Sequence, residues 1–437
     1  MHLLQQVRLL NSCKPLQIAF VRTPHFRLHS LFASPCSGQP NVKKLEELHR
    51  SLLGLRCANG ALFINKSPVT SYGGQGSKGL LLITRYFSTQ TGLPKLDPNQ
   101  LSRRLKLLLL TYLSGFIGVC LLSSIAFRYY SRMGRSALGI EDIKVPQYGR
   151  KPQLFRYRGF VYPDFVVNDV KSIHQFDVRE DDIWVVSFPK SGTTWVQEIV
   201  YLVNNGADFE SAGAATIEER FPYFEWIVPG LKSIEKMPSP RLIKSHLPLT
   251  MLPNQMKDKK PKIIYIARNP KDTVVSYYYF LTKFVIEDNI FNGTFDEYCQ
   301  LFIDDFVHYG PWWKHVKEAW ERREQDNILV LFYEDLQENI HKAVWDIAGF
   351  LNKPITEAQV NDIVKYCSFE TMRNNKAVNY DWLKDVGAAK EGEHFMRKGQ
   401  VGDWKNHLNK DIVDKLDQVV ATHLTPLGVP IRDTLPN

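Results

Sequence analysis

The second half of the chain repeats one pattern, in which a short and mostly apolar run is followed by a helical stretch. The apolar runs cover residues 183–188, 241–244, 262–267 and 328–333. Nearly continuous apolar strands are typical of parallel sheets, because helices cover both faces of such a sheet. The sequence therefore predicts an α/β fold with a doubly wound parallel sheet of the P-loop type. The flanking helices are predicted over residues 193–203, 270–281, 339–351 and 357–367.

The first apolar run leads into Phe188–Trp195, a turn that opens a helix. Backbone N–H groups of such a turn point at one spot, and the helix dipole favours an anion there. Lys190 adds a positive charge, and the hydroxyls of Ser191, Thr193 and Thr194 add donors. Because ligands of parallel sheets bind at the carboxyl ends of the strands, this turn is predicted to bind phosphate.

The order of residues in this turn differs from that of ATP- and GTP-binding loops. Those loops carry a lysine after their second glycine, whereas here Lys190 precedes Gly192, the one glycine of the turn. A P-loop kinase is therefore disfavoured, the more so because no acidic strand end is placed to hold Mg²⁺. The six cysteines form no CxxC pair, so a zinc site is not predicted, and nothing else in the sequence implies a metal.

The whole turn resembles the 5′-phosphosulfate loop of the cytosolic sulfotransferases, and further segments resemble that family in the family's order. Over about residues 155–430, these are Lys244–Pro248, Ala267–Asp272, Val275–Tyr278, Phe332–Asp335, Cys367–Met372, Phe395–Gly399 and Gly402–Lys405. Several stretches are most similar to the brain-type and invertebrate branch.

The resemblance implies transfer of a sulfuryl group from 3′-phosphoadenosine 5′-phosphosulfate to a hydroxyl or amine by in-line displacement. His246 would act as general base, Lys190 and Lys244 would stabilise developing charge, and Ser276 would restrain Lys190. Arg268, Ser276, Arg397, Lys398 and Gly399 would bind the 3′-phosphate, and Trp195, Tyr333 and Phe369 would surround the adenine. The implied donor site is completed by Ser191, Gly192, Thr193, Thr194, Cys367, Ser368, Met372, Phe395 and Met396.

The resemblance leaves the acceptor open. Loops at residues 221–226 and 280–291 are expected to build its pocket, which would suit a phenol, alcohol, sterol or amine. A catalytically weak nucleotide-binding or scaffold protein is the alternative, but the site residues of the motifs are intact. The family's C-terminal dimer segment is altered around Lys405, Asn409 and Asp414, which puts that dimer in doubt.

The positive charge of the chain is concentrated in its N-terminal third. Residues 1–134 carry 17 Lys and Arg but only 3 Asp and Glu, so the remaining residues are slightly acidic despite a net charge of +9. This distribution argues against a nucleic-acid partner. An acid-free, Arg-containing start and the sequence Arg85-Tyr86-Phe87-Ser88 resemble a mitochondrial presequence that ends near residue 87, within a targeting extension over residues 1–100.

Residues 107–127 form an uncharged stretch with basic flanks. A helix of that length spans about 30 Å, the thickness of a bilayer core, and a single membrane anchor is therefore predicted. A linker over residues 131–160 and a catalytic domain over 161–432 would follow. A chain that starts at Met133 would lack the anchor and be cytoplasmic.

Overall fold

The computed structural model describes residues 133–148, 154–284, 291–390 and 392–435, strands at 55–58 and 61–64, and the single residues Gly118, Ser123, Ser124 and Tyr129. The chain divides into two units, Met1–Arg132 and Met133–Asn437. In the first unit, β1 (Leu55–Ala58) pairs antiparallel with β2 (Ala61–Ile64). The predicted presequence lies outside the described residues, apart from this hairpin.

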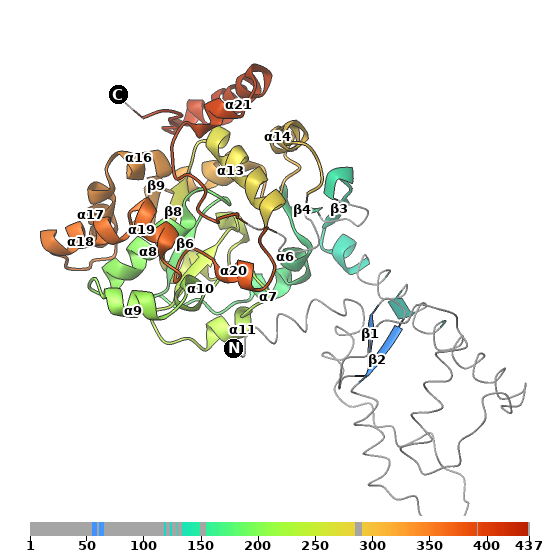
Figure 1. Cartoon of the computed structure of the whole chain (residues 1–437), viewed down its shortest axis with the longest axis horizontal. Helices are drawn as coiled ribbons and strands as arrows, with labels where there is room; N and C mark the ends of the chain where they lie inside the picture. Colours follow the sequence, from blue (N-terminus) through green and yellow to red (C-terminus); the bar gives the residue numbers. More distant parts are fainter. Residues whose placement is uncertain are drawn as a thin grey trace, which may run out of the picture. The chain divides into compact units, whose positions relative to one another are not determined.

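The second unit is built around a four-stranded parallel sheet in the order β7-β6-β8-β9 (Figure 1). Its strands are β6 (Ile183–Val186), β7 (Leu242–Ser245), β8 (Lys262–Ala267) and β9 (Ile328–Phe332). The chain first moves from β6 to β7 on one side and then crosses back to β8 on the other. All four predicted strands and the α/β fold class are confirmed. The carboxyl end of β6, where the strand order reverses, is the place where such sheets bind ligands.

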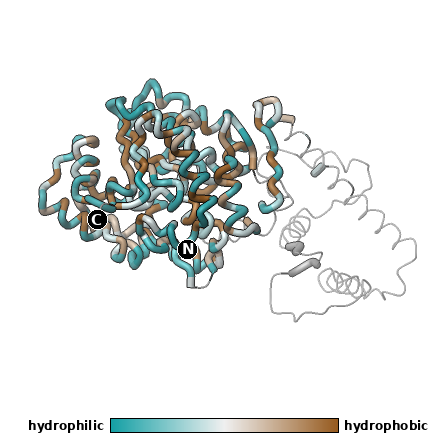
Figure 2. The backbone as a smooth tube through the Cα atoms, turned by 90° about the horizontal axis from the view of Figure 1, so that it is seen from above, coloured by the Kyte–Doolittle hydropathy of each residue, from teal (hydrophilic) through white to brown (hydrophobic). Residues whose placement is uncertain are grey.

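Side chains of the sheet alternate between two buried clusters, one on each face. Trp184 and Val186 of β6 belong to one cluster, and Ile183 and Val185 belong to the other. Helices cover both faces of the sheet (Figure 1), and hydrophobic stretches of the chain run through the middle of the unit (Figure 2). This burial on both faces explains why the strands are apolar along their whole length.

Helices of the first cluster are α6 (Asp164–Asn168), α7 (Val170–His174), α13 (Pro270–Lys283), α14 (Phe295–Ile303), α15 (Trp312–Trp320) and α21 (Lys410–His423). Helices of the second are α8 (Thr193–Asn204), α9 (Phe209–Ala214), α10 (Ile217–Arg220), α17 (Ile340–Phe350), α18 (Glu357–Tyr366) and α19 (Phe369–Asn374). Short helices α11 (Leu231–Glu235), α12 (Met256–Lys259), α16 (Tyr333–Glu338) and α20 (Trp382–Asp385) complete the set. The four predicted helices are confirmed, with ends shifted by one or two residues.

A small antiparallel sheet lies in the segment that was predicted to be a linker. It consists of β3 (Glu141–Ile143), β4 (Leu154–Tyr157) and β5 (Phe160–Tyr162). Leu154, Phe160 and Tyr162 are fully buried in the core. The folded unit therefore extends N-terminal to residue 161, because the nearly continuous burial of β4 and β5 outweighs the Gly and Pro residues that suggested a linker.

The predicted membrane anchor at residues 107–127 falls outside the described residues, apart from Gly118, Ser123 and Ser124. Within the part of the chain that is described, no helix has the length and apolar character needed to span a bilayer.

Candidate functional site

The turn between β6 and α8 brings backbone and side-chain donors to the carboxyl end of the sheet. Lys190 and Gly192 have positive φ angles of 69° and 102°. A Cβ on Gly192 would lie 2.7 Å from Cδ2 of Tyr333, so the close approach of this ring requires glycine. Ser187 and Thr193 share a hydrogen bond of 2.7 Å between their hydroxyls, which ties the strand end to the first turn of α8. No described side chain caps the N-terminus of α8, so its first N–H groups remain available to an anion.

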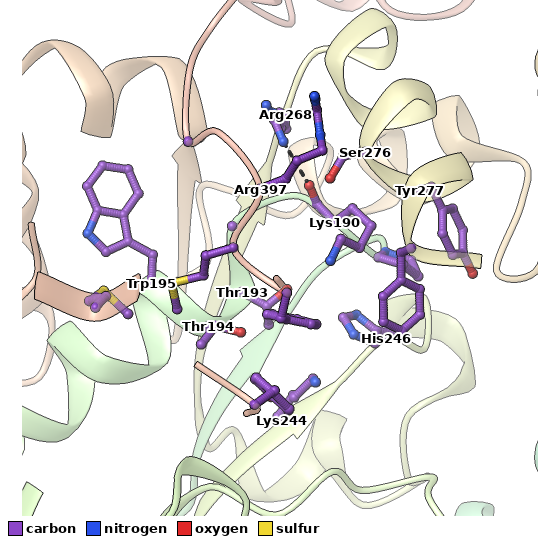
Figure 3. A pocket seen from close by; sticks show the side chains of 18 of the residues that line it. Lys190, Thr193, Thr194, Trp195, Lys244, His246, Arg268, Ser276, Tyr277 and Arg397 are labelled. Carbon is purple, nitrogen blue, oxygen red and sulfur yellow. Dashed lines mark hydrogen bonds between the residues drawn. The ribbon is translucent and has the colours of Figure 1, made fainter. Parts of the chain in front are cut away.

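Arg268, directly after β8, connects this turn to a distant segment, residues 395–404, which is called the C-terminal loop. Its guanidinium donates to the carbonyl oxygen of Lys190 at 3.3 Å (Figure 3) and to that of Gln400 at 3.1 Å. In the first turn of α13, Asp272 accepts hydrogen bonds from the backbone N–H groups of Gly402 at 2.8 Å and Trp404 at 3.0 Å. The C-terminal loop is thus held against the carboxyl end of the sheet by charge-assisted hydrogen bonds.

Asp403 organises the two basic residues of that loop. It accepts hydrogen bonds of 2.6 Å from both Arg397 and Lys398. These donors hold the pKa of the Asp403 carboxyl well below its usual range, although its partial burial acts in the opposite direction. The two cations are therefore positioned in advance, and each retains donors for another anion.

Lys190 lies where burial and like charges oppose its protonation. Its ammonium lies 3.9 Å from the ring centre of Phe395 and 4.6 Å from that of Phe280. Burial, with the charges of Lys244, Arg268 and Arg397, lowers the pKa of Lys190 to about 7. An anion bound here would reverse that effect and keep the ammonium charged.

His246 follows β7 and is held in one tautomer. Its Nδ1 lies 2.9 Å from the carbonyl oxygen of Ser187, and since a carbonyl only accepts, Nδ1 carries the proton. Nε2 is then left as the proton acceptor. Burial and the nearby charge of Lys244 lower the pKa of His246 well below its usual value, which keeps the ring neutral.

Glu225 fixes the backbone that carries His246. Its Oε1 accepts from the N–H of His246 at 2.7 Å, and its Oε2 accepts from the hydroxyl of Ser245 at 2.9 Å. Burial raises the pKa of Glu225 to about 7, although these hydrogen bonds oppose the rise.

An aromatic slot lies beside the first turn of α8. Trp195 donates from its indole to the carbonyl of Cys367 at 2.9 Å and meets the ring of Tyr333 edge-on at 5.6 Å. Phe369 opposes Gly399, where a Cβ would come within 2.2 Å of the ring and where φ is +65°. Glycine at position 399 is therefore needed for the C-terminal loop to lie against Phe369.

These parts enclose a cavity of about 540 Å³ (Figure 3). Every predicted site residue except Ser191 lines it. Ser191 is buried instead, and its hydroxyl has no hydrogen-bond partner in the part of the chain that is described. The basic wall of the cavity consists of Lys190, Arg268, Arg397 and Lys398.

An aromatic wall of the cavity, made of Phe165, Tyr223, Trp226 and Tyr309, lies beside His246. Tyr223 contacts the imidazole edge-on at 5.2 Å and shares a 2.7 Å hydrogen bond with the hydroxyl of Tyr309. Trp226 meets Phe165 edge-on at 4.8 Å and lies parallel to Tyr223 at 6.0 Å. The expected loop at residues 221–226 does contribute here, and Phe280 and Leu281 of the second expected loop also line the cavity.

Sequence reasoning missed several lining residues, namely Phe165, Glu218, His308, Tyr309, Tyr380, Trp382, Leu383 and Gln400. Gln400 directly follows the Phe395–Gly399 segment, so that motif could have indicated that Gln400 lies at the site. The others lie in segments without a recognisable motif. No cluster of His, Cys, Asp or Glu that could hold a metal ion occurs among the described residues.

The polar groups at this site fit a phosphorylated nucleotide. Two buried donors, the Ser191 hydroxyl and Nε of Arg268, lack partners within the described part of the protein. Unsatisfied buried donors are costly, and phosphate oxygens would satisfy them. The aromatic slot next to them supplies apolar rings of the kind against which a purine packs.

Comparison with known proteins identifies the family. A model described as the sulfotransferase domain matches residues 180–428. The chain belongs to the sulfotransferase family. The match covers both the phosphate-binding turn and the C-terminal loop of this sulfotransferase.

Curated relatives place it among the cytosolic-type members. Human sulfotransferase 1E1 is 40% identical over 262 residues, which cover 59% of this sulfotransferase and 88% of the relative. Sulfotransferase 1B1 of the dog, Canis lupus familiaris, is 41% identical over 270 residues, which cover 61% of this sulfotransferase and 90% of the relative. Sulfuryl transfer is the reaction that these relatives support.

Solved structures agree with the fold. A retinol dehydratase in complex with androsterone and the inactive cofactor PAP is 26% identical, with a TM-score of 0.59, and covers 64% of this sulfotransferase and 91% of that chain. Mouse sulfotransferase SULT7A1 complexed with PAP is 28% identical, with a TM-score of 0.51. The match covers 62% of this sulfotransferase and 94% of that chain.

Proposed function

We propose that this protein transfers a sulfuryl group from 3′-phosphoadenosine 5′-phosphosulfate to a small acceptor. The observation that carries the proposal is the convergence of the basic wall, the aromatic slot and a neutral His246 on one cavity. The structures that hold PAP, the desulfated form of this donor, support it by likeness.

The basic wall would bind the phosphates of the donor. Arg268, Arg397, Lys398 and the backbone of Gly399 would hold the 3′-phosphate, and Ser276 of α13 would link this group to Lys190. Trp195, Tyr333 and Phe369 would enclose the adenine, with Cys367, Ser368, Met372 and Met396 around them. Arginine suits the phosphate because its planar fork donates two parallel hydrogen bonds.

His246 would act on the acceptor. With Nδ1 bonded to the carbonyl of Ser187, Nε2 is free to take the acceptor's proton as the acceptor oxygen or nitrogen attacks sulfur. The bond between sulfur and the bridging oxygen then breaks, and Lys190 would stabilise the charge that develops on that oxygen. Lys244, whose ammonium lies 4.5 Å from the ring centre of Tyr223, would stabilise the transferred group.

The aromatic wall would bind the acceptor. Apolar rings next to a general base suit a small molecule with a hydroxyl or amine, such as a phenol, alcohol, sterol or amine. Androsterone, which is bound in the similar retinol dehydratase structure, is an acceptor-sized molecule of this kind.

The donor assignment is tested by calorimetry on the full-length protein. We expect PAP to bind at least about 100-fold more tightly than ADP, because several cations converge on the 3′-phosphate. Equal affinity for the two nucleotides would contradict the donor assignment. PAP binding without turnover in an acceptor screen would instead indicate the scaffold alternative.

We also propose a membrane location on the basis of the sequence alone. The basic start, the Arg85-Tyr86-Phe87-Ser88 site and the uncharged stretch at 107–127 would direct the chain to a mitochondrial membrane. A C-terminally tagged protein should sediment with mitochondria and resist carbonate extraction. A cytosolic product of about 305 residues would show that translation begins at Met133 and would refute this location.

A further inference from the structure

Glu218 is the only carboxylate that lines the cavity in the described part of the chain. It lies on α10, whose N-terminus is closed by a capping box between Thr216 and Glu219. The other charged residues of the lining are all basic, namely Lys190, Lys244, Arg268, Arg397 and Lys398. A single acidic side chain among them marks one part of the cavity as suited to positive charge.

The neighbours of Glu218 on α10 already have partners, but one of its own oxygens does not. Arg220 donates to Glu198 at 2.8 Å, and Glu219 is occupied in the capping box. Oε1 of Glu218 is buried and has no hydrogen-bond partner among the described residues. Burial raises the pKa of Glu218, and the charge of Lys244 and a hydrogen bond with Tyr380 only partly oppose this rise. The carboxylate is therefore left under-satisfied.

Glu218 lies on the acceptor side of the site. The segment that follows α10 runs along the end of β7, with Lys244 N–H donating to the carbonyl of Pro222 at 3.0 Å and Phe224 N–H donating to the carbonyl of Lys244 at 2.8 Å. This segment carries Tyr223 of the aromatic wall. The charge of Lys244 acts on Glu218, and the Lys244 ammonium lies 4.5 Å from the ring centre of Tyr223, so α10 borders the part of the cavity that the aromatic wall lines.

We propose that Glu218 binds the ammonium group of acceptors that carry both a hydroxyl and a protonated amine. An ammonium group supplies the N–H donors that the carboxylate lacks, and a charged hydrogen bond out of water is strong. This inference rests on the proposed function and specifies its acceptor. The ammonium group takes no part in bond formation: the hydroxyl oxygen attacks sulfur, its proton passes to His246, and the bridging oxygen leaves with the nucleotide.

The test compares two acceptors that differ only in charge, 4-(2-aminoethyl)phenol and 4-ethylphenol. For the full-length protein, kcat/KM for sulfation of each phenol is measured in the wild type and in Glu218→Gln. We expect the ratio of the amine to the neutral phenol to fall about tenfold in the variant, mainly through KM. The matched control is Glu219→Gln on the same helix, because glutamine preserves a capping box and Glu219 is exposed.

The outcomes separate this inference from the proposed function. An equal loss for both phenols in Glu218→Gln would indicate a purely structural role and overturn the inference. If neither phenol is sulfated by the wild type, the two phenols are titrated by calorimetry in the presence of PAP. Preferential binding of the amine that is lost in Glu218→Gln would then still support the inference, and its absence would overturn it.

Discussion

The basic wall and the aromatic wall of the cavity are built in different ways. Residues of the basic wall are positioned by hydrogen bonds to backbone groups and to a carboxylate. Arg268 donates to two carbonyl oxygens, and Asp403 accepts from Arg397 and Lys398. Residues of the aromatic wall are fixed by contacts between side chains, such as the hydroxyl pair of Tyr223 and Tyr309. Few side chains could replace residues that depend on hydrogen bonds to the backbone, whereas another aromatic side chain could replace a ring that is held only by contacts with other side chains.

This difference fits the separate tasks that the proposed function gives to the two walls. A site for an invariant phosphorylated donor needs fixed donors in fixed places. A site for the acceptor needs only apolar surface next to the base and a few specific polar groups. Mutations in the basic wall should therefore change nucleotide affinity, and mutations in the aromatic wall should change acceptor KM. His246 lies between the walls. A mutation there should change neither the nucleotide affinity nor the acceptor KM greatly.

The largest effect is expected from His246→Ala. Removing the base should lower kcat by about 10²–10⁴-fold, because proton transfer from the acceptor is lost. PAP affinity measured by calorimetry should stay within about threefold of the wild type, because the imidazole faces the acceptor. His341→Ala, at an exposed position of α17, is the control. A variant that keeps more than about a tenth of the wild-type rate would refute the general-base role.

The basic wall should make nucleotide binding depend on pH. The pKa of Lys190 is lowered to about 7 in the free protein, whereas a bound phosphate would favour the charged ammonium. Binding then takes up a proton above pH 7, so PAP affinity should fall by up to about tenfold per pH unit between pH 7 and 9. Lys190→Arg stays charged throughout and should flatten this dependence. An unchanged slope in that variant would show that another group titrates.

The sequence predicted the basic wall better than the aromatic wall for a physical reason. Lys190 and Arg268 each closely follow a predicted strand, and Arg397 and Lys398 lie in a short segment that resembles a family motif, so each is recognisable from its own neighbours in the sequence. Tyr309 reaches the cavity from a segment far from residue 223, and its hydroxyl contact depends on tertiary packing. No spacing rule predicts such a contact.

The fold itself followed from the apolar runs, because strands buried on both faces carry a strong signal. The antiparallel sheet of β3, β4 and β5 did not, since its strands are short and lie among Gly and Pro residues. Glu218 was missed for another reason. A carboxylate on a short helix is normally exposed, and only the packing of α10 shows that it lines the cavity.

A smaller effect on the basic wall is expected from Gly399→Ala. The new Cβ would come within 2.2 Å of the Phe369 ring at a φ of +65°, so the C-terminal loop must shift. PAP affinity should fall about tenfold by calorimetry. The matched control is Gly387→Ala, which has a similar φ of +71° but open space around the new Cβ. Its PAP affinity should be unchanged while its stability falls by about 1 kcal/mol, and equal losses of affinity in both variants would refute the contact argument.

The smallest effect is expected in the aromatic wall, from Tyr223→Phe. This change removes the 2.7 Å hydrogen bond to Tyr309 but keeps the ring that packs against His246. Acceptor KM should rise about two- to fivefold and thermal unfolding should show a loss of about 1 kcal/mol, because one buried hydroxyl is left without its partner. Tyr298→Phe is the control, since its buried hydroxyl has no partner among the described residues and its removal should cost nothing. PAP affinity should be unchanged in both variants, because the ring contacts of the aromatic wall do not reach the groups that hold phosphate. A change in PAP affinity comparable to that of Gly399→Ala would mean that the two walls are coupled and that the division of tasks is wrong.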